Sequence, residues 1–72
     1  MTDIDEHYPD SRSIERVRYT EASMELEVTF KNGGVYVYLG VPSGEVAALL
    51  AAESKGRYVA VYVKKRYQVR KA

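Results

Sequence analysis

The chain has 72 residues, which leaves room for one domain, because single cores rarely divide below about 150 residues. Apolar side chains make up 46% of it and charged side chains 29%, a balance typical of a folded protein rather than a disordered one. Zero cysteines and one histidine exclude a disulfide framework, a cysteine zinc site and any site of several histidines. The thin core of so short a domain argues against a deep substrate pocket, and the absence of cysteine fits the cytoplasm.

The beginning of the chain is acidic, contains Pro9 and shows no sustained apolar period. This composition predicts a flexible acidic N-terminal arm over residues 1–11, followed by a single domain over residues 12–72. The arm lacks the basic start and the apolar stretch of a secretory leader. The longest apolar run, residues 46–52, is too short to span a bilayer, so we expect no membrane partner.

Acidic residues and the histidine alternate in this arm, at Asp3, Asp5 and His7. A calcium loop of the EF-hand type that began at Asp3 would need glycine at its sixth position and glutamate at its twelfth. Tyr8 and Ile14 occupy those positions. We therefore expect no metal site and no cofactor.

Three stretches have the composition of strands. Residues 24–31 alternate between apolar and polar side chains, and residues 14–20 and 35–39 are rich in β-prone types. Short links at 21–23 and 32–34 join the three stretches. The sequence predicts an antiparallel meander of three strands.

The second link decides where two tyrosines point. A two-residue loop would pair Phe30 with a valine, whereas a three-residue loop over residues 32–34 would pair it with Tyr36. In the second case Tyr36 and Tyr38 pack inward, and in the first they face solvent. The residues alone leave both alternatives open.

A helix is predicted after the meander. Pro42 cannot donate to a sheet, Ser43 is a good N-cap, and Glu45 complements the positive end of the helix dipole. Lys55-Gly56 is a plausible stop, because glycine adopts a left-handed conformation at a helix C-terminus without strain.

The segment over residues 57–66 is ambiguous, since its valines alternate as in a strand while its tyrosines also lie four residues apart. We favour a second short helix, because residues 64–66 are basic and would lie at its C-terminal end. The tail after Tyr67 either extends the sheet or frays. The fold class is therefore α+β: a three-stranded antiparallel β-meander followed by two short helices packed on one face.

Positive charge is concentrated at the end of the chain, because seven of the eleven lysine and arginine residues lie after residue 54 and no acid follows Glu53. Clustered cations neutralise phosphate, and tyrosines interleaved among them can stack on unpaired bases. The segment predicts binding of RNA or single-stranded nucleic acid. The candidate residues are Lys55, Arg57, Tyr58, Tyr62, Lys64, Lys65, Arg66, Tyr67, Arg70 and Lys71.

Several short strings in this order resemble the KTSC domain, a small module named for its occurrence at the C-terminus of some lysyl-tRNA synthetases. The resemblance spans about residues 11 to 70. The matching strings are Phe30, Asn32-Gly33, Tyr36-Val37-Tyr38, Val41-Pro42, Leu49-Leu50, Ser54-Lys55-Gly56-Arg57-Tyr58, Val63-Lys64 and Tyr67.

The resemblance implies a stand-alone or appended domain of bacteria and their phages, for which RNA binding has been proposed. It also favours inward-facing Tyr36 and Tyr38, because the family pattern keeps both tyrosines. Two positions depart from that pattern. Val59-Ala60 stands where an aromatic residue followed by asparagine is usual, and Gln68 stands where proline often follows the tyrosine.

Two other functions fit parts of the sequence. A histidine-free nuclease built from Tyr62, Lys65 and Arg66 is chemically possible, but the same residues serve plain binding without a tuned acid or base, so we expect no enzyme. The alternative is a protein–protein interaction or phage-associated accessory domain that contacts its partner through exposed apolar residues such as Val59 and Val61.

Overall fold

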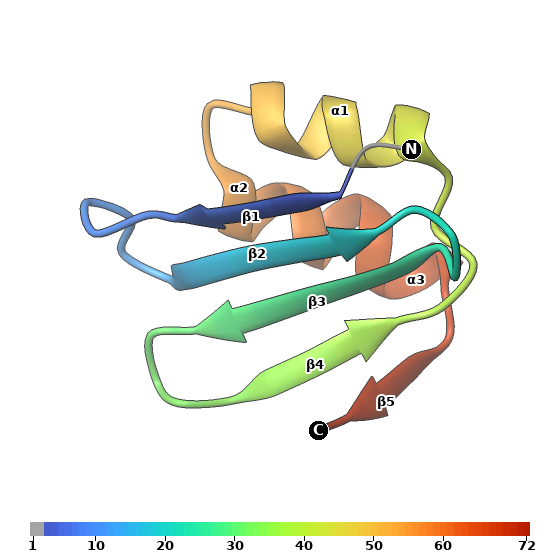
Figure 1. Cartoon of the computed structure of the whole chain (residues 1–72). Coiled ribbons are helices and arrows are strands. Elements are labelled where there is room, and N and C mark those ends of the chain that lie inside the picture. Colours follow the sequence, from blue (N-terminus) through green and yellow to red (C-terminus); the bar gives the residue numbers. More distant parts are fainter. Residues whose placement is uncertain (1–2) are drawn as a thin grey trace.

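The structure, a computed structural model, describes residues 3–72. It contains one five-stranded antiparallel sheet in the order β1-β2-β3-β4-β5, with the helices packed on one face (Figure 1). The elements in chain order are β1 (Ile4–His7), β2 (Ile14–Thr20), β3 (Glu25–Phe30), β4 (Val35–Tyr38), α1 (Ser43–Ala51), α2 (Lys55–Tyr58), the π-helical turn η1 (Val59–Val63), α3 (Lys64–Arg66) and β5 (Val69–Lys71).

The predicted α+β class, the central meander β2-β3-β4 and the helical face are confirmed. The predicted number of three strands is wrong, because β1 and β5 add one strand to each edge. Both added strands are mostly exposed and polar, so neither carries the apolar alternation by which a strand is predicted.

Residues 4–7 were expected to belong to a flexible arm and instead form β1; Met1 and Thr2, the first part of that arm, lie outside the described residues. Ile4 lies opposite Tyr19 in the ladder with β2. Asp5 accepts two hydrogen bonds from the Arg16 guanidinium, at 2.8 and 2.6 Å. Charge pairing across strands holds this edge, where the core contributes little.

The tail after Tyr67 extends the sheet, which decides between the two alternatives left open for it. Val69 lies opposite Tyr38 and Lys71 opposite Tyr36, so β5 pairs antiparallel with β4. The chain reaches this position by crossing the helical face of the sheet from β4 (Figure 1).

The β3-β4 hairpin turns its tyrosines inward, as the resemblance favoured. Tyr36 lies opposite Val28, and Tyr38 lies opposite Leu26. Phe30 is paired with Gly34, to whose carbonyl its amide donates at 2.8 Å, and not with Tyr36 as the three-residue loop over 32–34 predicted. The loop is three residues long but begins one residue earlier, which leaves the face of each side chain unchanged.

The core lies between the inner face of the sheet and the helices. The Tyr19 hydroxyl is buried there and donates to the carbonyl of Val41 at 2.7 Å, which ties β2 to the start of the helical layer. The cluster of buried side chains consists of Ile14, Val17, Tyr19, Leu26, Val28, Tyr38, Val41, Val46, Leu49, Val59 and Val63.

The predicted helix over residues 57–66 is confirmed, and its basic end is α3. Its middle is a π-helical turn, a feature that accommodates one extra residue and is frequent at functional sites. No helix within the described part of the chain is long and apolar enough to cross a membrane.

The first helix begins at Ser43, as predicted, but the predicted N-cap and the predicted stop are wrong. Pro42 is the N-cap and Ser43 is already helical, so the serine hydroxyl makes no capping bond. The helix ends at Ala51, and Lys55-Gly56 begins α2 instead of stopping α1.

Gly56 is required by close packing rather than by a left-handed turn. A Cβ at this position would lie 2.0 Å from the Ser13 Oγ and 3.0 Å from the Ser13 Cβ. The helix therefore approaches the loop before β2 so closely that a side chain at this position would force Ser13 to move.

Two glycine-to-alanine substitutions distinguish the effect of this contact on stability from the effect of helix propensity. Gly56→Ala overpacks the contact with Ser13 by about 1–3 kcal/mol, offset by about 1 kcal/mol of helix propensity, so we expect a net loss of up to about 2 kcal/mol. Gly44→Ala, which meets nothing within 4 Å, should stabilise by about 0.4–1 kcal/mol.

Urea unfolding of each variant measures the difference. The double variant Ser13→Gly with Gly56→Ala should recover the loss relative to Ser13→Gly alone. Equal effects of Gly56→Ala in the two backgrounds would contradict the close contact.

Candidate nucleic-acid interface

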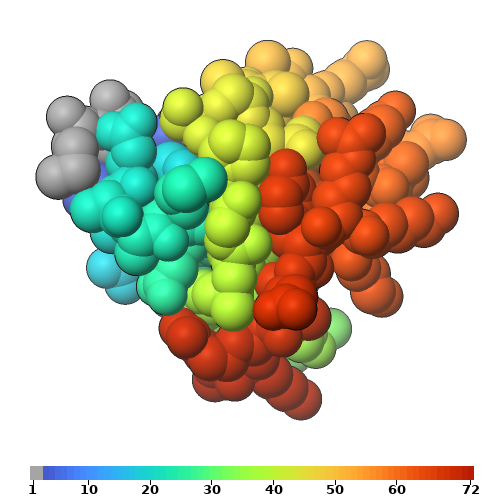
Figure 2. Space-filling view, turned by 90° about the vertical axis from the view of Figure 1, so that its right-hand side faces the viewer, coloured from blue at the N-terminus to red at the C-terminus, as the bar shows by residue number. Residues whose placement is uncertain are grey.

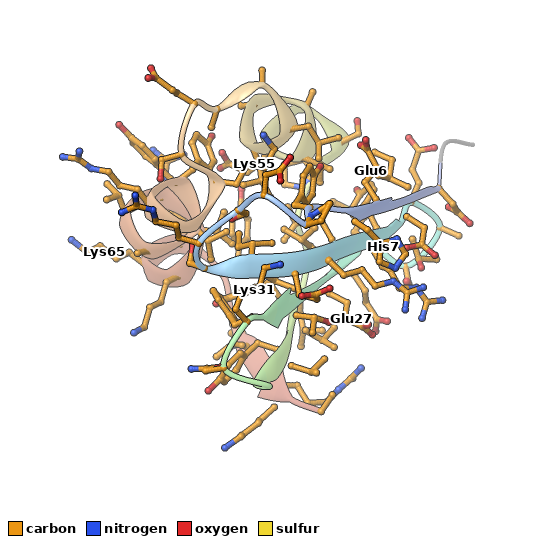
Figure 3. All side chains as sticks on the ribbon, turned by 90° about the vertical axis from the view of Figure 1, so that its left-hand side faces the viewer. Glu6, His7, Glu27, Lys31, Lys55 and Lys65 are labelled. Carbon is orange, nitrogen blue, oxygen red and sulfur yellow. The ribbon has the colours of Figure 1, made fainter. Side chains whose placement is uncertain are left out.

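The structure does not gather all the predicted cations on one surface. Arg70 lies on the sheet face opposite the helices and approaches Glu25 at 3.9 Å. Lys55 lies beside the β1-β2 loop, with its Nζ 5.0 Å from the centre of the Tyr8 ring (Figure 3). Lys71 is exposed on the edge strand β5. Each of these cations is separate from the exposed side of the second helix.

Most of the other candidates do meet, on the exposed side of the helix that runs through residues 55–66. We call this surface the Tyr62 face. Figure 2 shows the side chains of this helix, in orange and red, projecting from one side of the molecule. The Tyr62 face consists of Arg57, Tyr58, Val61, Tyr62, Lys65 and Arg66.

Tyr62 is the centre of this face, with 45% of its surface exposed. Its ring lies 4.8 Å from the Tyr58 ring at an interplanar angle of 38°, and the Arg66 guanidinium lies 5.7 Å from its centre. The Tyr62 ring therefore contacts the Tyr58 ring and the Arg66 guanidinium, and the rest of its surface stays open to solvent.

A hollow of about 520 Å³ adjoins this ring, between the helix and the loop that follows α1. Arg57, Tyr58, Val61 and Tyr62 form its helical side. Arg57 and Lys65 make no ion pair within residues 3–72, and Lys65 points away from the body of the molecule (Figure 3). Arg57 lines the hollow opposite Glu53, whereas Lys65 lies outside the lining on the same helix, so each is a cation on this side of the domain without an ion-pair partner among the described residues.

Glu45 at the start of α1 organises the tyrosines behind this face. Its side chain is 8% exposed. The Tyr58 hydroxyl donates to Oε2, the Tyr67 hydroxyl donates to Oε1 at 3.0 Å, and Arg66 donates to Oε1 at 3.2 Å. One carboxylate therefore joins α1, the second helix and the residue that leads into β5.

These donors set the ionisation of the group. The hydrogen bond from Tyr58, together with those from Tyr67 and Arg66, holds the pKa of Glu45 below its ordinary value of 4.5, against the opposing effect of burial. The same bond raises the pKa of Tyr58. Burial and the bond to Glu45 raise the pKa of Tyr67.

The sequence signalled Glu45 only as an acid in the first turn of a helix, and its three partners lie 13 to 22 residues away along the chain. Tyr67, predicted as a stacking residue, instead directs its hydroxyl to this carboxylate. Val59, predicted as a contact for a protein partner, is 2% exposed and belongs to the core, which corrects that expectation. Val61 is 43% exposed and stays on the surface.

Fold and surface together define a small α+β domain that covers one face of an antiparallel sheet with helices and presents tyrosines among basic residues on one of them. The chain belongs to the KTSC domain family, whose profile matches residues 10–67. It is similar to a KTSC domain protein from Yersinia pestis, with a TM-score of 0.88, 30% sequence identity and 99% of both chains covered.

Two bacterial sequences are also similar. A protein from Tsukamurella paurometabola is 41% identical over 59 residues, which cover 82% of this chain and 88% of that protein. An uncharacterized protein from Stutzerimonas stutzeri is 42% identical over 48 residues, which cover 67% of this chain and 68% of that protein.

Replacing Glu45 by glutamine tests the carboxylate. At pH 7 we expect Glu45→Gln to lower the free energy of unfolding by about 1–3 kcal/mol, because two hydroxyls and a guanidinium lose a charged acceptor. Because the pKa of Glu45 is lower in the folded protein than in the unfolded chain, its ionised carboxylate stabilises the fold fully above pH 4.5. This stabilisation is lost as the pH falls through the pKa of the folded state.

Urea unfolding at pH 7 and at pH 3 measures both effects. The difference between wild type and variant should shrink at pH 3, whereas Glu53→Gln, which changes an exposed carboxylate, should stay within about 0.5 kcal/mol of wild type. A difference that does not change with pH would contradict the role given to the charge.

Proposed function

We propose that this KTSC domain is a small, non-catalytic cytoplasmic module that binds RNA or single-stranded nucleic acid on the Tyr62 face. The observation that supports this most is the Tyr62 ring, 45% exposed, which is braced by Tyr58 and flanked by unpaired cations. An exposed aromatic ring can stack on an unpaired base, whatever the identity of that base.

The charge around the ring supports the same ligand. Arg57 and Lys65 are free to neutralise phosphates on either side of a stacked base, and the Arg66 guanidinium adds positive charge at the ring itself. Phosphate contacts fix the strand, and stacking tolerates any base, so the expected binding has little sequence preference.

Glu45 supports a binder rather than a catalyst. A general acid or base works best with a pKa near the operating pH. The hydrogen bonds from Tyr58, Tyr67 and Arg66 lower the pKa of Glu45, which takes it further from neutral pH. Its observed contacts are those of an internal brace, which positions Tyr58 under Tyr62.

Salt dependence tests the ligand class. For a fluorescent 12-nucleotide oligouridine, log affinity should fall with log salt at a slope of about −0.7 per neutralised phosphate. Lys65→Gln should reduce that slope by about 0.7, whereas Arg70→Gln, the same loss of charge on the opposite sheet face, should leave it unchanged. Fluorescence anisotropy at four salt concentrations measures the slopes.

Affinity that barely responds to salt would contradict the proposal. Equal effects of the Lys65 and Arg70 variants would contradict the choice of surface. If Val61 and Tyr62 serve a protein partner instead, oligouridine should fail to bind even at low salt.

The ring itself is tested by a matched pair of substitutions. Tyr62→Ala should weaken oligouridine binding by about 5- to 150-fold, the range of about 1–3 kcal/mol for one stacked base. Tyr62→Phe keeps the ring and should bind nearly as wild type. Since neither change touches the buried core, unfolding should confirm that both variants are folded. If Tyr62→Ala binds oligouridine with full affinity, Tyr62 does not contact the ligand.

A further inference from the structure

A second hollow lies on the other side of the same helix, between it and the β4-β5 edge of the sheet. Its volume is about 310 Å³, at the lower limit of the range of about 300–1,000 Å³ for small-molecule sites. Its lining is aromatic, aliphatic and basic, with no carboxylate. The residues are Phe30, Asn32, Tyr36, Tyr38, Gly56, Val59, Ala60, Lys64 and Val69, and we call this hollow the Tyr38 groove.

The sheet supplies rings to this groove, and the helix supplies small residues. Phe30 and Tyr36 meet edge to face, with their centres 5.7 Å apart. Gly56 and Ala60 on the helical wall have too little volume to cover those rings. The groove therefore has room for one flat group against aromatic surface.

Tyr38 is one of the residues that line this space. Its side chain is 4% exposed, yet its hydroxyl has no partner among residues 3–72. The hydroxyl nevertheless keeps contact with solvent, because no fully buried side-chain oxygen of the described residues lacks a partner. The Tyr38 hydroxyl is therefore free to exchange its water partner for an acceptor on a ligand.

The rim offers further donors. The Asn32 Oδ1 accepts from the Gly34 amide at 2.9 Å, which leaves the amide nitrogen of Asn32 to donate elsewhere. Lys64 lines the groove and forms no ion pair within the described residues. The complementary ligand is thus flat, rich in acceptors and negatively charged on one side.

We infer that the Tyr38 groove receives the base of one nucleotide, with a base oxygen or nitrogen accepting from the Tyr38 hydroxyl and the phosphate on Lys64. This rests on the proposed function in one respect, because it names the same class of ligand. It differs in that the groove should hold a single nucleotide on its own, whereas the Tyr62 face needs a strand.

The probe is uridine 5′-monophosphate, and its binding is measured from the NMR amide signals of the isotope-labelled full chain. Inorganic phosphate is the control for a bare anion. The nucleotide should move the signals of Gly56, Ala60 and Lys64. Tyr38→Phe keeps the ring and should weaken binding by about 2- to 10-fold, the effect of one hydrogen bond.

A substitution that fills the groove gives a second readout. Ala60→Leu places a larger side chain over the rings at an exposed helical position and should abolish nucleotide binding. The same change at Ala48, which is exposed on α1 and does not line the groove, should leave binding unchanged.

The outcomes separate the two proposals. If oligouridine binds with the expected salt slope while the nucleotide moves no groove signal, the groove inference fails and the proposed function stands. If the nucleotide binds in the groove and oligouridine does not bind, the groove inference stands and the Tyr62 face fails. Identical shifts with inorganic phosphate, or full nucleotide binding by Ala60→Leu, would overturn the groove inference.

Discussion

The helical layer depends on one carboxylate. Glu45 lies at the start of α1, is nearly buried, and accepts from Tyr58, Tyr67 and Arg66. A buried charge is tolerated only when its donors are in place, so this group fixes the two helices relative to each other. The Tyr62 face follows from that arrangement, because Tyr58 is held at Glu45 by its hydroxyl and supports Tyr62 by its ring. The position of the exposed ring is therefore set from inside the domain.

Elements with strong apolar patterns were predictable. The alternation of residues 24–31 predicted β3. The residues alone left the direction of Tyr36 and Tyr38 open, and only the resemblance to the KTSC family favoured the inward direction that the hairpin register shows. The edge strands were not predictable, because their order comes from partners elsewhere. Asp5 is held by Arg16, and Val69 by its ladder position opposite Tyr38, and neither contact leaves a local signal.

The candidate site was predictable in composition but not in arrangement. Charge density located the second helix and its tyrosines, yet the chain distributes the cations over a loop contact at Lys55, the helix, and the far sheet face at Arg70. Helix propensity could not show that Gly56 serves a close approach to Ser13, because the colliding atom lies 43 residues earlier. Long-range packing decides such positions, and a single sequence does not display it.

The topology of β5 has a consequence for how the domain folds and opens. Strands β1 to β4 join as successive hairpins, whereas β5 pairs with β4 only after the chain has crossed the helices, with Tyr38 opposite Val69. Closing so long a loop is slower than zipping a hairpin, so the meander forms early and the last strand docks late. In native-state hydrogen exchange the β5 amides should therefore belong to the first unit to open. Each opening would remove Val69 from the wall of the Tyr38 groove and so widen the groove.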